Sequence, residues 1–191
     1  MKKKTALLFF FSLIVLLWGC SAAPSRFYTL STTARASPGG TFPYAVSVGP
    51  VTIPPAVDRP QIVSRIGPNQ VRIDEFNRWA SPLKDDIARI VAENLSGQLG
   101  SARVTTFPQA AADEAAYRVT IDVLSLESVP GKSAAIDALW TVRRIEDGRV
   151  RSGRTSWKET VADPGYDALV AAHSRALGRL SEDIAQALIA P

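Results

Sequence analysis

Three consecutive segments in the second half of the chain restrict the fold more than any other feature. Apolar and polar residues alternate over Tyr117–Val123 and again over Ile136–Val142, which is the two-residue period of a half-buried β-strand. The alternation changes phase at Leu124, as it does at a β-bulge. Asp147–Gly148 is a strong hairpin pair and leads into a third apolar segment, 150–161. The sequence therefore predicts an antiparallel meander of three strands.

Two longer segments show the 3.6-residue period of amphipathic helices. The first follows Ser81, which we expect to be the N-cap, with Pro82 at the first helical position. The second opens at Asp163–Pro164. The expected buried faces are Leu83, Ile87, Ile90, Val91, Leu95 and Leu99 in the first helix and Leu169, Val170, His173, Ala176, Leu177, Leu180, Ile184 and Leu188 in the second.

The remaining apolar segments predict further strands. Residues 44–53 are β-branched and apolar, and residues 61–66 and 70–76 flank a Gly-Pro-Asn turn as the two strands of a hairpin would. A short strand is expected over 103–107. The fold class that follows is α/β of the α+β kind: one domain, with two amphipathic helices packed on one mixed, largely antiparallel β-sheet.

The N-terminus has the pattern of a secretion signal. Three lysines precede an apolar run over Ala6–Trp18, which is shorter than the roughly 20 residues of a permanent membrane helix and makes that alternative the weaker one. Leu17, Gly19 and Cys20 resemble the lipobox of bacterial lipoproteins, in which leucine and a small residue are read by the lipoprotein signal peptidase. Trp18 departs from the usual small residue. We therefore expect residues 1–19 to be a signal peptide and Cys20 to be the lipidated N-terminus.

Lipidation of Cys20 has consequences for redox chemistry and location. Cys20 is the only cysteine, so an internal disulfide is excluded, and the covalent lipid is the only prosthetic group we expect. Residues 20–26 form the lipidated end and a tether of about 20 Å at full extension, before a domain over 27–191. Ser21 stands where an aspartate would favour the inner membrane in the lipoproteins that this N-terminus resembles. The expected location is the periplasmic face of the outer membrane.

The charge of the mature chain argues against nucleic acid as a partner. Removal of residues 1–19 deletes three of the 22 basic side chains and leaves 19 against 18 acidic ones, a net charge of +1. A nucleic-acid-binding protein requires a concentrated basic surface. The basic character of the precursor belongs mostly to its signal peptide.

The sequence offers little for catalysis. It contains no G-x-S-x-G, G-x-G-x-x-G or P-loop motif and no metal-type spacing of cysteine and histidine. His173, the only histidine, lies on the apolar face of the last helix, which is typical of a structural residue. Asp85 and Asp86 are adjacent, and so are Asp74 and Glu75, and neighbouring side chains do not face each other. We expect no enzyme, no catalytic residue and no metal ligand, although a glycosidase with scattered carboxylates stays open.

Residues 73–83 combine two aromatic and two acidic side chains at a strand-to-helix junction. Arg78 and Trp79 are the candidate partner interface, because an arginine beside a large aromatic is the composition of an interface anchor. The alternative is structural. Trp79 then closes the end of the core, and Arg78 pairs locally with Asp74 or Glu75.

The order and spacing of four segments resemble the PqiC-like lipoproteins, the ABC-type transport auxiliary lipoproteins. The segments are Cys20, Ser25–Leu30, Gly49–Ile53 and Phe76–Leu83. The resemblance implies a non-catalytic component of an intermembrane lipid transport system that maintains envelope integrity. The implied partners are an MCE-domain protein and inner-membrane transport subunits. As a hypothesis, the lipoprotein docks the MCE assembly at the outer membrane, and a homo-oligomeric ring of several copies is one form that this docking could take.

Two other functions stay open at this point. A lipid-binding carrier would hold acyl chains between its helices and sheet and would copurify with lipid beyond its own anchor. A hydrolase acting on envelope polymers would lose turnover when one carboxylate is removed.

Overall fold

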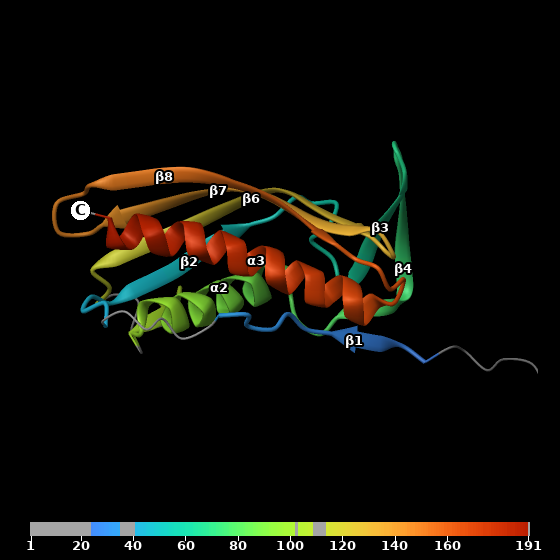
Figure 1. Ribbon diagram of the computed structural model, residues 1–191, viewed down its shortest axis with the longest axis horizontal. Coiled ribbons are helices and arrows are strands. Elements are labelled where there is room, and N and C mark those ends of the chain that lie inside the picture. The colour runs from blue at the N-terminus through green and yellow to red at the C-terminus, as the bar shows by residue number, and fades with distance from the viewer. Residues whose placement is uncertain (1–23, 35–40, 102, 109–113, 191) are drawn as a thin grey trace, which may run out of the picture.

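The strands of this protein form two sheets, and two helices complete the chain. The computed structural model describes residues 24–34, 41–101, 103–108 and 114–190 (Figure 1). In chain order the elements are β1 (Arg26–Tyr28), β2 (Val46–Thr52), β3 (Gln61–Gly67), β4 (Gln70–Trp79), α2 (Leu83–Leu99), β5 (Val104–Thr106), β6 (Tyr117–Val129), β7 (Ser133–Arg144), β8 (Val150–Thr160) and α3 (Tyr166–Ile189).

The larger sheet contains five strands in the order β5-β2-β6-β7-β8. β2 lies parallel to both β5 and β6, and β6, β7 and β8 form the predicted antiparallel meander. The register between β6 and β7 shifts between Val123 and Ser125, which confirms the bulge expected from the change of phase at Leu124.

Both helices cover the same face of this sheet (Figure 1), and the core lies between the layers. The predicted apolar stripes of α2 and α3 are buried there. The predicted helix starts are wrong by one or two residues. Ser81 makes no capping hydrogen bond, and the Pro82 carbonyl accepts the first hydrogen bonds of α2. Asp163 instead accepts a hydrogen bond from the backbone N–H of Gly165 (2.6 Å), just before α3 begins at Tyr166.

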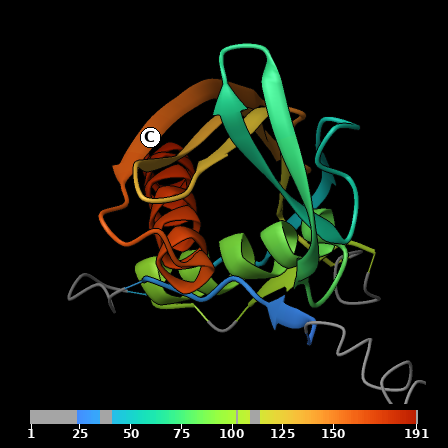
Figure 2. The ribbon, with the colours of Figure 1, turned by 90° about the vertical axis from the view of Figure 1, so that its right-hand side faces the viewer.

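The predicted hairpin of β3 and β4 is confirmed, but it does not join the main sheet. It forms a separate sheet in the order β1-β4-β3, so the expectation of one sheet is wrong. From the pair Gln61–Arg78 to the pair Val63–Ile73, two steps along β3 correspond to five along β4. This bulge bends the hairpin away from the main sheet, and the hairpin stands at one end of the molecule (Figures 1 and 2).

Within the described ranges, no helix combines the length and the apolar character that a membrane crossing needs. Leu17, Gly19 and Cys20 lie outside the described residues.

Candidate functional site

The first residues that the structure describes, from Pro24 onwards, lead directly into β1 of the small sheet. β1 runs parallel to the end of β4, with Arg26 opposite Asn77 and Tyr28 opposite Trp79. Cys20, the predicted site of lipidation, precedes Arg26 by six residues. The predicted tether therefore leaves the domain at the end that carries the β3–β4 hairpin, which Figure 2 shows face on.

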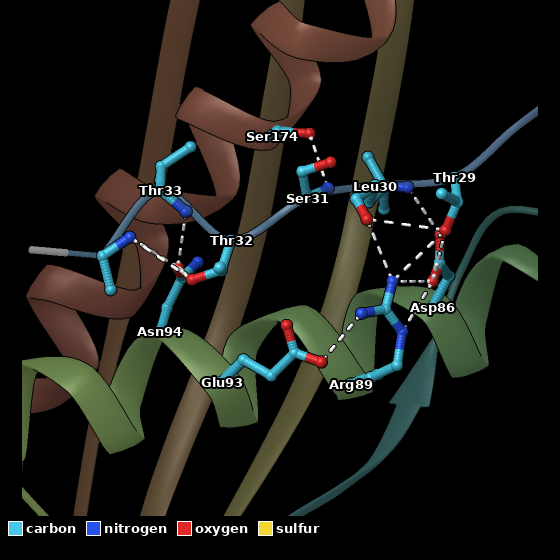
Figure 3. Close-up of polar contacts among 11 residues, drawn as sticks. Thr29, Leu30, Ser31, Thr32, Thr33, Asp86, Arg89, Glu93, Asn94 and Ser174 are labelled. Atoms are coloured by element: carbon cyan, nitrogen blue, oxygen red, sulfur yellow. Dashed lines mark hydrogen bonds and ion pairs between the residues drawn. The ribbon is translucent and has the colours of Figure 1, made fainter.

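After β1, residues 29–34 lie across both helices, and we call this segment the strap (Figure 3). The strap belongs to no sheet, yet Leu30 in it is buried in the core. Backbone groups in such a position need hydrogen-bond partners. Polar side chains of α2 and α3 supply them.

Asp86 and Arg89 of α2 bind the first half of the strap. The buried Asp86 carboxylate accepts a hydrogen bond from the Leu30 N–H (2.8 Å), and Arg89 Nη2 donates to the Leu30 carbonyl (3.0 Å). Arg89 also pairs with Asp86 and with Glu93. Burial by itself lowers the pKa of Arg89, but the hydrogen bonds to Asp86 and Glu93 outweigh that effect and raise it. The guanidinium stays charged and holds both the carboxylate and the strap.

Asn94 binds the second half of the strap. Its side-chain oxygen accepts hydrogen bonds from the Thr32 hydroxyl (2.8 Å) and from the N–H groups of Thr33 and Ala34 (3.0 Å each). On α3, the Ser174 hydroxyl accepts from the Ser31 N–H (3.1 Å). Asn94 is completely buried, so three donors of the strap depend on one amide that solvent does not reach.

Sequence reasoning missed this site. The available signal was the presence of polar residues on otherwise apolar helix faces, namely Asp86, Asn94, Ser174 and Ser181. A glycine adds to it: a Cβ at Gly178 would overlap the Thr33 hydroxyl. The helix surface is thus shaped to let the strap lie directly against it.

A second polar network joins the strand of the tether to the hairpin. Tyr28 donates to the side-chain oxygen of Asn77 (2.8 Å), and Tyr166 at the start of α3 donates to Asp74 (2.8 Å). Asp74 also accepts from the N–H groups of Phe76 and Asn77. Burial by itself raises the pKa of Asp74, but these hydrogen bonds together lower it below its ordinary value. The carboxylate therefore stays ionised and holds the bulge of β4 in place.

The candidate interface pair lies next to this network. Trp79 is only 6% exposed, and its ring packs edge-on against His173, with centroids 6.4 Å apart. Arg78 approaches Glu75 at 3.8 Å, a loose pair of partly exposed groups. These positions favour the packing role for Trp79 and local pairing for Arg78. A partner interface at these two residues stays a prediction.

His173 is buried, as its place on the apolar stripe predicts. Its Nε2 lies 2.8 Å from the Ser128 hydroxyl, and Nδ1 has no hydrogen-bond partner. Burial lowers the pKa of His173 to about 4, so the ring is neutral at pH 7. A nucleophilic dyad requires access to substrate and an orienting group on the second nitrogen, and this pair has neither. Among the described residues, no three acidic, histidine or cysteine side chains cluster as metal ligands would.

The fold and the strap define a class: an α+β domain whose first strand pairs with a separate hairpin and whose strap is tied to both helices. The family model described as "ABC-type transport auxiliary lipoprotein component" matches residues 28–185, and the chain belongs to this family. The family description denotes a lipoprotein of the cell envelope that assists an ABC-type transporter.

Solved structures support the fold. A protein of the DUF330 family from Xanthomonas campestris is 20% identical over 86% of this chain and 95% of its own, with a TM-score of 0.70. An uncharacterized protein is also 20% identical, over 87% of this chain and 99% of its own, with a TM-score of 0.71. At this level of identity the likeness concerns the fold alone. No curated protein matches the sequence significantly.

Proposed function

We propose that this protein is a non-catalytic lipoprotein that docks an MCE-type intermembrane lipid transport assembly at the periplasmic face of the outer membrane. By doing so it supports envelope integrity. The family membership supports the auxiliary role, and the description as an auxiliary component favours a protein without catalysis. The lipid on Cys20 is its membrane anchor, and Ser21 favours the outer membrane.

The observation that carries the proposal is the attachment of the strap. A tether of six residues spans about 20 Å at most, and the strap begins immediately after β1. Since one buried and three partly buried hydrogen bonds hold residues 30–34 to both helices, the tether cannot lengthen without breaking them. The domain is therefore held close to its membrane. A docking component needs this arrangement, whereas a carrier that crosses the periplasm needs a long tether.

The opposite end of the molecule supplies a surface for the partner. There the rings of Phe42, Tyr44 and Tyr117 contact one another, with centroids 5.5–5.7 Å apart. They line a cavity of about 240 Å³ together with arginines of β7 and β8 and the last turn of α3. Aromatic and arginine side chains are enriched at interface hot spots. A partner that arrives from the inner membrane meets this end first, because it lies farthest from the tether (Figure 1).

Gentle detergent extraction of the tagged lipoprotein, followed by mass spectrometry, tests the proposal. An MCE-domain protein should be enriched with the parent chain and lost with a Tyr44→Ser variant, while a Leu124→Ser variant, at a similarly exposed position in the middle of β6, retains it. Native mass spectrometry of the same material counts the copies in a ring. Recovery of stoichiometric phospholipid without any MCE-domain protein would contradict docking and support the carrier.

The anchor is tested separately. A secreted Cys20→Ala form should fail to restore detergent resistance to cells that lack the protein. If it restored resistance fully, the membrane attachment would be dispensable and the docking mechanism would be wrong.

A further inference from the structure

The β3–β4 hairpin extends beyond the main sheet (Figure 1), and its outer half carries three exposed, large apolar side chains. Ile66, Val71 and Ile73 in this half are 46%, 54% and 42% exposed. Exposed apolar strands promote association with other surfaces. A hairpin surrounded only by water would therefore be expected to carry polar residues at these positions.

The apolar surface continues along the same small sheet towards the tether. Phe76 in the bulge of β4 is 47% exposed, and Phe27 in β1 is 64% exposed. We call Phe27, Ile66, Val71, Ile73 and Phe76 the apolar rim. Single exposed apolar side chains are normal, but these five follow one another along one three-stranded sheet. In the hairpin they occupy both faces, because Val71 and Ile73 pair with Arg65 and Val63, whereas Ile66 is on the other face.

Basic residues surround a hollow beside the rim. The hollow, of about 450 Å³, lies between the hairpin and the β6–β7 turn and is lined by Arg65, Arg72 and Lys132. Arg65 pairs with Glu127 at 2.7 Å, whereas Arg72 and Lys132 have no ion-pair partner among the described residues. The buried Ser64 hydroxyl is also in the lining, where it interacts with the Tyr166 hydroxyl. This combination suits a phosphate group.

The position of the tether indicates which surface lies against this end of the molecule. Arg26 lies opposite Asn77, the neighbour of Phe76 in β4, and six residues separate Cys20 from the domain at this point. Full extension of that segment reaches about 20 Å. The surface to which the lipid is attached therefore lies within reach of the apolar rim, and the other end of the molecule points away from it (Figures 1 and 2).

We propose that the apolar rim and the basic hollow form a membrane-contacting surface, which docks directly on the phospholipid bilayer. The rim enters the boundary between headgroups and acyl chains, and Arg72 and Lys132 contact lipid phosphates. The inference deepens the proposed docking function and rests on it for the position of the membrane.

The role of this contact is orientation rather than affinity. Three acyl chains on Cys20 hold the protein on the membrane by themselves. Because the anchor keeps the rim near the lipid, a weak surface contact is sufficient to be occupied most of the time. The contact presents the Phe42–Tyr44–Tyr117 end to the periplasm.

Single introduced cysteines test the orientation. In the lipidated protein, the only native cysteine has no free thiol, so a fluorophore labels only the new residue. Val71→Cys and Val150→Cys are a matched pair, since both valines follow hairpin turns and are 54% and 45% exposed at opposite ends. Each protein is reconstituted in phosphatidylethanolamine–phosphatidylglycerol vesicles that carry a nitroxide on the acyl chain. The label at Val71→Cys should lose at least about twofold more fluorescence than the label at Val150→Cys.

A second measurement does not depend on the anchor. The mature Cys20→Ser chain should sediment weakly with the same vesicles, and joint Val71→Ser and Ile73→Ser replacement should reduce binding about tenfold. Circular dichroism verifies that the variant is folded. Vesicles without phosphatidylglycerol should bind less, through loss of the attraction to Arg72 and Lys132.

Equal fluorescence quenching at the two labelled sites would overturn the proposal. Vesicle binding that is unchanged by the two serine replacements would overturn it as well. Shielding of the label at Val71→Cys that depends only on protein concentration would also overturn it and assign the rim to a second copy. Labelling of the parent chain would reveal an unlipidated Cys20. That result contradicts the proposed anchor, and the sedimentation of the Cys20→Ser chain still decides the surface.

Discussion

Replacement of His173 by glutamine should remove a large part of the acid sensitivity of this protein. The buried ring has its pKa lowered to about 4, against 6.5 for an exposed histidine. Since the folded state binds the proton less tightly than the unfolded chain, protonation favours unfolding. The stability from the neutral ring is fully present above pH 6.5 and is lost as the pH falls through 4.

The magnitude follows from the two pKa values. Linkage gives a loss of about 2 kcal/mol in the free energy of unfolding between pH 7 and pH 5. Below pH 4 the loss approaches about 3 kcal/mol, which is the value of a shift of two to three pKa units. A glutamine does not titrate, and it can still hydrogen-bond to the Ser128 hydroxyl, so His173→Gln isolates the charge.

Urea unfolding of the mature Cys20→Ala chain, followed by tryptophan fluorescence, measures this effect. The parent should lose about 2 kcal/mol more than His173→Gln between pH 7 and pH 5. Ser128→Ala is the matched control, because it leaves the histidine buried and should keep the pH dependence of the parent at lower stability. Parallel curves for the parent and His173→Gln would refute the assignment.

Three further predictions concern the strap, the network and the sheet. Asn94→Ala leaves three donors of the strap without their acceptor and should lower the free energy of unfolding by about 2–4 kcal/mol, more than Asn94→Asp, which keeps an oxygen; urea titration compares the two. Tyr166→Phe removes a hydrogen bond that lowers the pKa of Asp74, so NMR titration should show that pKa rising, and an unchanged value would exclude the contact. A Cβ at Gly153 would overlap the Trp140 ring, so Gly153→Ala should lower the free energy of unfolding by roughly 1–3 kcal/mol and the melting temperature by several degrees. Gly67→Ala is the control, because its Cβ meets only ordinary contacts and the melting temperature should not fall.

Periodicity located most of the secondary structure because it reports which face of an element is buried. The meander, its bulge at Leu124, the hairpin and both helices are in place. The helix starts were less accurate, since Ser81 and Asp163 satisfy the local rules for capping but the chain continues past them before it turns helical.

The candidate site could not be found in this way. The strap residues 29–34 have no period of their own, and their partners are 56 to 143 positions away along the chain. Polar residues such as Asp86 and Asn94 on an apolar face signalled that something polar packs there, but not which segment. Arg78 and Trp79 were noticed because of their composition, and only tertiary packing shows that the tryptophan is buried.

The sequence by itself determined the fold class, the three-stranded meander and the two helices, because these depend on local period and turn residues. It also placed Cys20 directly before the domain, from which the predicted anchor follows. Only the tertiary structure decided that the hairpin leaves the main sheet, that the strap lies across both helices, and that an apolar rim stands where the tether leaves. These features depend on pairing between distant segments, such as Arg26 with Asn77, and local sequence carries no record of which partner a strand edge will find.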